Sequence, residues 1–119
     1  MITSNELFAR IDDFSMATLI VEHFAADATM VFGNNEPMVG RDAMVAGTAH
    51  FGAAIKALRH RIRQEWTVAD TSIVVTEATY TRLDAKQVTI PATAIWRVGD
   101  DGLISDFRVY YDPSPVFAP

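Results

Sequence analysis

The chain has 119 residues, a length that predicts one domain spanning residues 1–119. Its formal net charge of −5 gives a surface that repels phosphate backbones, so no nucleic-acid partner is expected. Cysteine is absent, which excludes disulfides, thiolate catalysis and cysteine metal sites and favours a cytoplasmic location.

The sequence pattern of the first half of the chain predicts mainly helices. Leu7, Phe8 and Ile11 recur at helical spacing in "TSNELFARIDD", residues 3–13, and Thr3 or Ser4 can cap that helix. Further helices are expected over residues 15–24 and 40–58, with a β-rich stretch between them at 27–33. The segment "GNNEPMVG" that follows this stretch is dense in turn-forming residues.

From residue 59 onward the pattern changes to β-strands. Four strands are expected over residues 59–69, 72–83, 87–98 and 103–112, with "LDAK" and "GDDG" as hairpin turns. The prolines of the tail "DPSPVFAP" lack an amide donor, so the tail cannot continue a central strand. Helices followed by antiparallel strands predict an α+β fold, in which a long curved sheet wraps against three helices and encloses an apolar space.

Signals for a membrane, a metal or a cofactor are missing from the sequence. The N-terminus lacks the apolar core of a signal peptide, and the longest apolar runs are far too short to span a bilayer, so no membrane partner is expected. His23, His50 and His60 lack the spacing of metal ligands, and no metal is predicted. "GRDAMVAG" lacks the lysine of a phosphate-binding loop, and no cofactor is expected.

The stretch "LRHRIRQEW", residues 58–66, divides into two faces because alternate residues of a strand point to opposite sides. One face is charged and should meet water or a second subunit: Arg59, Arg61, Arg63, Glu65 and Thr67. The other is mixed and should face the helices: His60, Ile62, Gln64, Trp66 and Val68. His60, Gln64 and Trp66 are therefore expected to point polar groups into the fold.

Several local strings resemble the nuclear transport factor 2-like superfamily, and within it the small bacterial SnoaL-like proteins. These strings are "HFAADATMVFGN", "EPMVGRDAM", "TYTRLD" and "DGLISDFRVYYDPSP". The resemblance implies a cone-shaped α+β barrel with a pocket between the helices and the sheet, and a homodimer formed through the outer sheet face. The superfamily includes ketosteroid isomerases, polyketide cyclases, limonene epoxide hydrolase and binding modules without catalysis, so the fold alone does not determine the function.

Only some of the catalytic residues of these relatives have a chemically equivalent residue at the matching position of this chain. The resemblance places the oxyanion tyrosine of the isomerases on Phe8 and their general-base aspartate near Val31 or Phe32, none of which can donate or accept a proton. Arg82 and Asp84 match an Arg-x-Asp motif of the epoxide hydrolase, but the second aspartate of that enzyme falls on Val109. Any catalysis would therefore use a different set of residues.

The candidate catalytic residues are His60, Asp84 and Arg82. A histidine titrates near pH 6.5, which suits proton transfer, although a buried histidine bonded to a neighbour is the structural alternative for His60. Asp84 could be a base held by Arg82, or the two could form an ion pair within the "LDAK" turn. The candidate substrate-binding residues are Trp66, Tyr80, Asn34, Gln64, Trp96, Phe107 and Tyr111. Core packing, or turn chemistry for Asn34, explains each of them equally well.

The sequence favours a cofactor-independent enzyme that acts by proton transfer, as an isomerase, cyclase or hydratase, on a small hydrophobic cyclic or polyketide-like molecule. The alternative is a ligand-binding or dimerisation module of the same fold without chemistry. A closed interior without a cavity would favour the module, and a cavity that reaches His60 would favour the enzyme.

Overall fold

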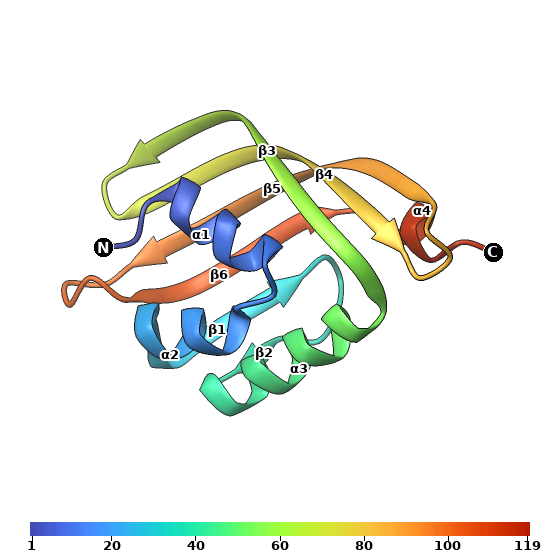
Figure 1. Cartoon of the computed structure of the whole chain (residues 1–119). Coiled ribbons are helices and arrows are strands. Elements are labelled where there is room, and N and C mark those ends of the chain that lie inside the picture. The colour runs from blue at the N-terminus through green and yellow to red at the C-terminus, as the bar shows by residue number, and fades with distance from the viewer.

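The computed structural model describes all residues, 1–119, and contains four helices and six strands (Figure 1). In chain order these are α1 (Ser4–Asp12), α2 (Met16–His23), β1 (Phe24–Phe32), β2 (Met38–Val39), α3 (Arg41–Ala53), β3 (Ile55–Val68), β4 (Thr71–Arg82), β5 (Gln87–Val98), β6 (Ile104–Tyr111) and α4 (Ser114–Phe117). Thr3 caps α1, because its hydroxyl oxygen accepts the Glu6 backbone N–H at 3.2 Å.

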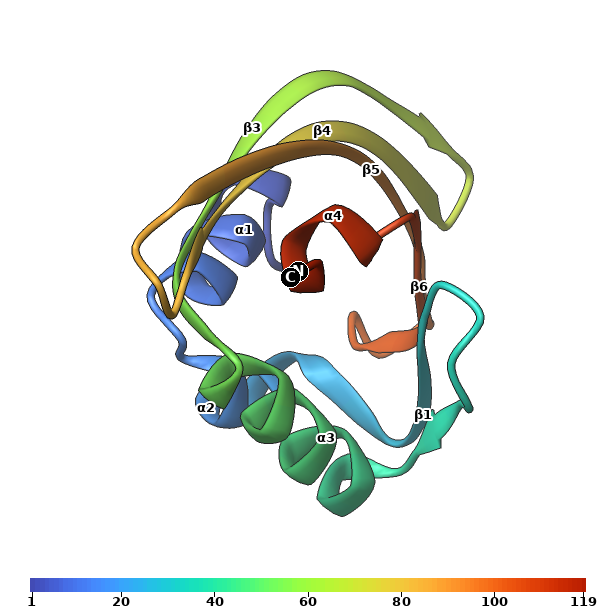
Figure 2. The same cartoon turned by 90° about the vertical axis from the view of Figure 1, so that its right-hand side faces the viewer.

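All six strands form one sheet in the order β2-β1-β6-β5-β4-β3. The β1–β6 pair is parallel, and the other pairs are antiparallel. The sheet curves around the helices, as the view in Figure 2 shows. The expected α+β fold with a curved, mainly antiparallel sheet against three helices is confirmed. The sheet stays open between its edge strands β2 and β3, so it is not closed into a barrel.

The main core lies between α1, α2, α3 and the concave face of the sheet. Its largest fully buried side chains include Phe24, Phe107, Leu7, Leu19 and Ile20. A second, smaller core lies where the tail returns to the sheet, and it consists of Ile55, Ala78, Tyr80, Ile90 and Val116. Burying an aliphatic or aromatic side chain of this size stabilises the fold by about 1.5–3 kcal/mol each.

A β-bulge at Arg63 reverses the faces of β3 halfway along the strand. Ile62 pairs with Thr76 and Gln64 pairs with Val75, which leaves Arg63 without a partner position. His60 and Ile62 therefore share the inner face with Ala78 and Thr76, whereas Gln64 and Trp66 point outward. The expectation that Gln64 and Trp66 face the helices is wrong, because one extra residue shifts the alternation that follows it.

The other sequence expectations differ mainly at the ends of elements. The two hairpin turns at "LDAK" and "GDDG" are confirmed. The third helix ends at Ala53 rather than continuing to Leu58, because the chain enters β3 at Ile55. The tail leaves the sheet and forms α4, whose first turn is held by Asp112, which accepts hydrogen bonds from the Ser114 backbone N–H and hydroxyl.

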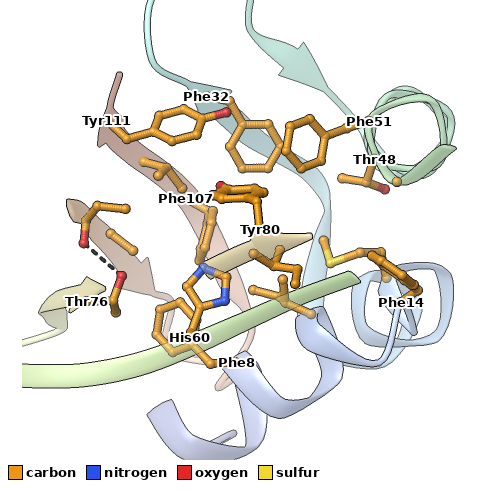
Figure 3. Close-up of a pocket in the computed structure, with 17 residues that line it drawn as sticks. Phe8, Phe14, Phe32, Thr48, Phe51, His60, Thr76, Tyr80, Phe107 and Tyr111 are labelled. Carbon is orange, nitrogen blue, oxygen red and sulfur yellow. Dashed lines mark hydrogen bonds between the residues drawn. The ribbon is translucent and has the colours of Figure 1, made fainter. Parts of the chain in front are cut away.

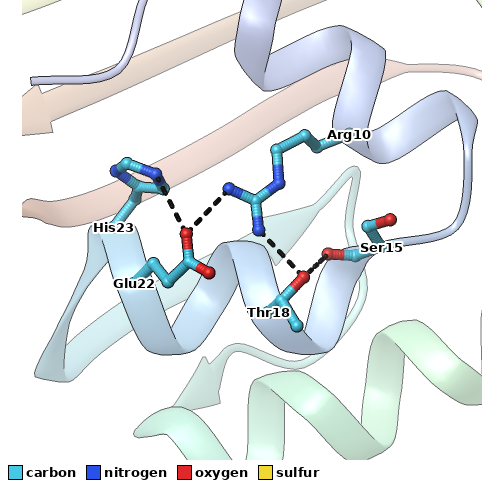
Figure 4. Close-up of polar contacts among 5 residues, drawn as sticks. All are labelled: Arg10, Ser15, Thr18, Glu22 and His23. Carbon is cyan, nitrogen blue, oxygen red and sulfur yellow. Dashed lines mark hydrogen bonds and ion pairs between the residues drawn. The ribbon is translucent and has the colours of Figure 1, made fainter.

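Polar contacts of Arg10 hold α1 against α2 (Figure 4). One guanidinium nitrogen lies 3.1 Å from a carboxylate oxygen of Glu22, and another donates to the Thr18 hydroxyl at 2.8 Å. Thr18 in turn donates to the Ser15 carbonyl at 3.1 Å. The turn between the two helices is therefore fixed on both sides. None of the helices is long and apolar enough to cross a membrane.

Candidate functional site

A cavity lies between the concave face of the sheet and helices α1 and α3 (Figure 3). Its volume is about 70 Å³ for the centres of water molecules, so it could hold several waters or a small ligand. Of its 17 lining residues, 13 are hydrophobic, and none is Lys, Arg, Asp or Glu. The aromatic side chains among them are Phe8, Phe14, Phe32, Phe51, Tyr80, Phe107 and Tyr111.

Three of the side chains that line this cavity have a polar atom without a hydrogen-bond partner in the protein. Thr48 and Thr76 also line it, but their hydroxyls donate to the carbonyls of Met44 and Ala92 at 2.7 and 2.9 Å. His60, Tyr80 and Tyr111 remain. No fully buried side-chain nitrogen or oxygen lacks a partner. Nε2 of His60 and the two tyrosine hydroxyls, which have no hydrogen-bond partner in the protein, are therefore not fully buried.

Asp12, the last residue of α1, holds His60 through two contacts. One carboxylate oxygen lies 2.6 Å from Nδ1 of the ring, and the other accepts the His60 backbone N–H at 2.8 Å. The two side chains are 21% and 10% exposed. Because a carboxylate can only accept, the ring proton is placed on Nδ1. In the neutral imidazole, Nε2 then carries the lone pair and can accept a proton.

The ring of His60 is also positioned by packing. It lies against Phe8, with ring centroids 4.8 Å apart, and Phe8 packs edge-on against Trp96. The inner face of β3 supplies His60, and the C-terminal end of α1 brings Asp12 to it. An acid, its partner histidine and an apolar wall therefore meet at one side of the cavity.

The two tyrosines are poised to remain un-ionised hydrogen-bond donors. Burial raises the pKa of Tyr80, and the nearby Tyr111 and Asp12 raise it further. Burial also raises the pKa of Tyr111. Desolvation disfavours a phenolate, so both groups keep their O–H at neutral pH and can donate to a ligand oxygen.

The structure brings four of the sequence-predicted residues together at the cavity, namely His60, Tyr80, Phe107 and Tyr111. Arg82 and Asp84 lie outside it. Nε of Arg82 donates to Asp84 at 3.2 Å, and the Lys86 backbone N–H donates to the same carboxylate oxygen at 3.1 Å. This second bond, followed by the contact with Arg82, lowers the pKa of Asp84. Of the two alternatives for this pair, the structure shows the ion pair within the hairpin turn, and the catalytic role at the pocket is corrected.

The remaining four candidates also lie away from the cavity lining. Asn34 is exposed in the turn after β1, and Gln64 and Trp66 lie on the outer face of β3. Trp96 is buried in the main core, stacked on Phe107 with ring centroids 5.7 Å apart. It stands behind the residues that line the cavity, so its expected position is corrected to a core position.

Sequence reasoning missed Asp12, although a local signal exists. Asp12 and Asp13 lie at the C-terminal end of α1, where the helix dipole disfavours negative charge. An acidic residue at such a position is explained when it has a specific partner, here 48 positions away in the sequence. Phe8, Phe32 and Val109, where the resemblance places catalytic groups of relatives, line the cavity with apolar side chains.

No group of three or more His, Asp or Glu side chains is arranged to hold a metal ion. The side chains with polar groups that line the cavity are His60, Tyr80, Tyr111, Thr48 and Thr76.

The chain was compared with known proteins. Residues 6–107 match the family model of the SnoaL-like domain. No curated protein sequence matches the chain significantly. Among solved structures, a nuclear transport factor 2-like protein of unknown function from Burkholderia pseudomallei is 14% identical with a TM-score of 0.84, covering 96% of this chain and 94% of that one.

Two further structures show the same fold. A putative SnoaL-like polyketide cyclase from Jannaschia is 16% identical with a TM-score of 0.78, covering 97% of this chain and 92% of its own. A protein with a ketosteroid isomerase-like fold from Catenulispora acidiphila, in complex with trimethylamine, is 21% identical with a TM-score of 0.82, covering 96% and 91%. From the family match over most of its length and this shared fold, the chain belongs to the SnoaL-like domain family.

Proposed function

We propose that the protein catalyses proton transfer, without a cofactor, on a small neutral molecule that carries a carbonyl group. The observation that carries this proposal is the Asp12–His60 contact at the wall of an apolar cavity. Asp12 fixes the ring so that Nε2 is the free nitrogen. Such a pair, in which a carboxylate orients a histidine, is a general way to prepare a base for proton abstraction.

The proposed step begins with Nε2 of His60, which removes a proton from the carbon next to the carbonyl. The C–H electron pair forms the enolate, and its oxygen accepts a hydrogen bond from Tyr80 or Tyr111. Donors directed at an oxygen that gains negative charge stabilise the transition state strongly in a water-poor site. In a ketone whose enolate is conjugated with a carbon–carbon double bond, the protonated His60 then returns the proton to the far carbon of that conjugated system, which gives an isomerisation. In a molecule with a second carbonyl, the enolate carbon attacks that carbonyl carbon, the C=O π pair moves to the oxygen, and the protonated His60 gives its proton to this alkoxide, which completes a cyclisation.

The charge of the cavity supports a neutral ligand. No Lys or Arg side chain lines it, so a carboxylate or phosphate group would lose its hydration without a permanently charged ion-pair partner. The aromatic lining suits a flat or cyclic apolar molecule. SnoaL-like polyketide cyclases occur among the structural relatives, which is consistent with this ligand class.

The alternative function is a ligand-binding module without chemistry. It is favoured by Phe8, Phe32 and Val109, which are apolar at the positions where the resemblance places catalytic groups of relatives. A binding module and an enzyme differ in one measurable property, because only the enzyme moves a proton.

Hydrogen–deuterium exchange at the carbon next to a ketone tests the proposal without knowledge of the natural substrate. 2-Tetralone in D₂O is followed by proton NMR with the wild-type protein, His60→Gln and, as a matched control, His50→Gln, whose histidine is exposed on α3. We expect wild type and His50→Gln to accelerate the exchange, and His60→Gln to reduce the acceleration at least a hundredfold. Binding of 2-tetralone without acceleration would establish the binding module instead.

We also propose that the protein forms a homodimer through the outer face of its sheet. Helices cover only the concave face, and the outer face presents Trp66, Ile73, Val75, Ile95 and Tyr110. Trp66 is 48% exposed and Tyr110 is 54% exposed. Aromatic residues in an apolar patch with ion pairs around it, such as Arg63–Glu77, are typical of protein interfaces.

A further inference from the structure

A second hollow lies on the surface between α2 and α3, and it adjoins the cavity. Its volume is about 280 Å³ for the centres of water molecules. Seven residues line it: Phe14, Met16, Ala17, Val45, Thr48, Ala49 and Gly52. Four of them, Phe14, Met16, Thr48 and Gly52, also line the cavity. The hollow, called the α2–α3 groove below, therefore lies next to the cavity and shares these four lining residues with it.

Phe14 stands at the boundary between the cavity and the groove. It lies in the turn between α1 and α2, and its side chain is 47% exposed although it lines an internal cavity. Its backbone has φ of 63°, a left-handed conformation that a bulky residue rarely adopts. In Figure 3, Phe14 lies on the side of the lining residues away from Tyr111. The ring of Phe14 therefore forms part of the wall of both the cavity and the groove.

The position opposite Phe14 is a glycine. A side-chain carbon added to Gly52 would lie 3.8 Å from Cδ1 of Phe14, at ordinary contact distance. A longer side chain there would fill the space between α3 and the ring. Gly52 thus leaves room beside Phe14 within the wall that the cavity and the groove share.

The backbone of the turn is held by hydrogen bonds, and Phe14 is half exposed. The Phe14 N–H donates to the Ile11 carbonyl at 3.1 Å, and the Ser15 N–H donates to the Arg10 carbonyl at 2.9 Å. The contacts of Arg10 with Glu22 and Thr18 brace the two helices on either side (Figure 4). Movement at this point is therefore expected from rotation of the Phe14 side chain.

One end of the curved sheet is covered by α4, which packs against two residues that line the cavity. Val116 is buried in the same cluster as Tyr80, and Phe117 packs edge-on against Phe51 with ring centroids 6.1 Å apart. Figure 2 shows α4 across that end of the curved sheet. A ligand too long for the cavity would thus extend toward Phe14 rather than toward α4.

We propose that the α2–α3 groove is a second ligand subsite, which holds the apolar tail of an elongated neutral ketone while the carbonyl group lies beside His60. This inference rests on the proposed function and adds the shape of the substrate. Ala17, Val45 and Ala49 offer small apolar surfaces, and no charged residue lines the groove, so the tail is an alkyl or aryl group. Phe14 turns aside to admit the tail and packs against it.

A series of phenyl alkyl ketones from acetophenone to octanophenone tests the subsite by titration calorimetry. Each added methylene that leaves water should tighten binding about fourfold. We expect this gain in wild type once the chain is long enough to pass Phe14. The variant Ala49→Asp places a charge in the groove, and Ala46→Asp, on an exposed position of the same helix outside the groove, is its matched control.

The expected result is that Ala49→Asp binds octanophenone at least tenfold more weakly than wild type while acetophenone binds both equally, and that Ala46→Asp behaves as wild type. Equal loss for both ketones, or no loss for octanophenone, would overturn the subsite and leave the proposed function standing. Failure of acetophenone to bind the wild-type protein would overturn the proposed ketone-binding function and the subsite with it. Far-ultraviolet circular dichroism of each variant confirms that it is folded.

Discussion

One carboxylate oxygen of Asp12 lies 2.6 Å from Nδ1 of His60, and the other accepts the backbone N–H of the same residue at 2.8 Å. A single side chain at the end of α1 thus fixes both the ring and the strand that carries it. The two residues are 48 positions apart, so this contact also ties the first helix to the edge of the sheet. The Asp12–His60 contact therefore contributes both to the candidate site and to the packing of α1 on β3.

Asp12→Asn is expected to reduce the exchange rate of 2-tetralone at least a hundredfold. The amide oxygen can still accept the backbone N–H, but its NH₂ group then faces Nδ1 and moves the ring proton to Nε2, where no base remains. Asp27→Asn removes the same charge from an exposed position of β1 and should leave the rate unchanged. An Asp12→Asn protein as active as wild type would remove Asp12 from the mechanism.

The raised pKa of Tyr80 in the folded protein should make the protein less stable at high pH. Its pKa is raised in the folded state, so above its ordinary value of 10.0 the folded protein keeps a proton that the unfolded chain has lost. The contribution of Tyr80 to the free energy of unfolding is therefore fully present below pH 10. Above pH 10 the free energy of unfolding falls by up to about 1.4 kcal/mol per pH unit. Urea unfolding between pH 9 and 11.5 measures it. Tyr80→Phe should reduce this slope, and a slope equal to that of wild type would contradict the assignment.

The backbone of Phe14 should prefer glycine to alanine. At φ of 63°, a residue with a Cβ pays a steric cost of about 1–2 kcal/mol that glycine does not. Both variants lose the ring, so the comparison isolates the backbone. We expect Phe14→Gly to be more stable than Phe14→Ala by about 1 kcal/mol in chemical unfolding. Equal stabilities would show that the turn relaxes to a different conformation.

The proposed dimer should depend on Trp66. Light scattering of the wild-type protein should give about twice the 13.1 kDa of one chain. Trp66→Glu adds a charge to the outer face on the edge strand β3 and should give a single chain, whereas Leu83→Glu, in the exposed hairpin turn, should not. A wild-type mass near 13.1 kDa would contradict the dimer.

The fold was largely predictable because its signals are local or periodic. The alternating burial of β4, with Val74, Thr76, Ala78 and Tyr80 inside, follows from strand geometry alone. The bulge at Arg63 has no such signal in the sequence, because a strand with one unpaired residue has the same composition and a similar length as a regular strand. Gln64 and Trp66 were therefore assigned to the wrong face, while His60, which precedes the bulge, was assigned to the correct one.

The site was only partly predictable because its contacts cross the fold. His60 could be placed inside by parity, because it precedes the bulge, and Tyr80, Phe107 and Tyr111 could be proposed for the pocket as aromatic side chains. Asp12 could not, because its partner is set by how α1 packs on β3. For Arg82 and Asp84, the sequence motif matches both a catalytic motif and an ordinary hairpin turn. The hydrogen bonds within the turn explain both residues without a catalytic role.

The central claim is that Asp12 presents Nε2 of His60 to a ligand in the cavity, and long-range proton–nitrogen NMR of the three histidine rings tests it most directly. In the absence of ligand, neutral His60 should carry its proton on Nδ1. Addition of 2-tetralone should shift its Nε2 resonance and leave those of His23 and His50 in place. A proton on Nε2 of the neutral ring, or an Nε2 resonance that does not respond to the ketone, would contradict the claim.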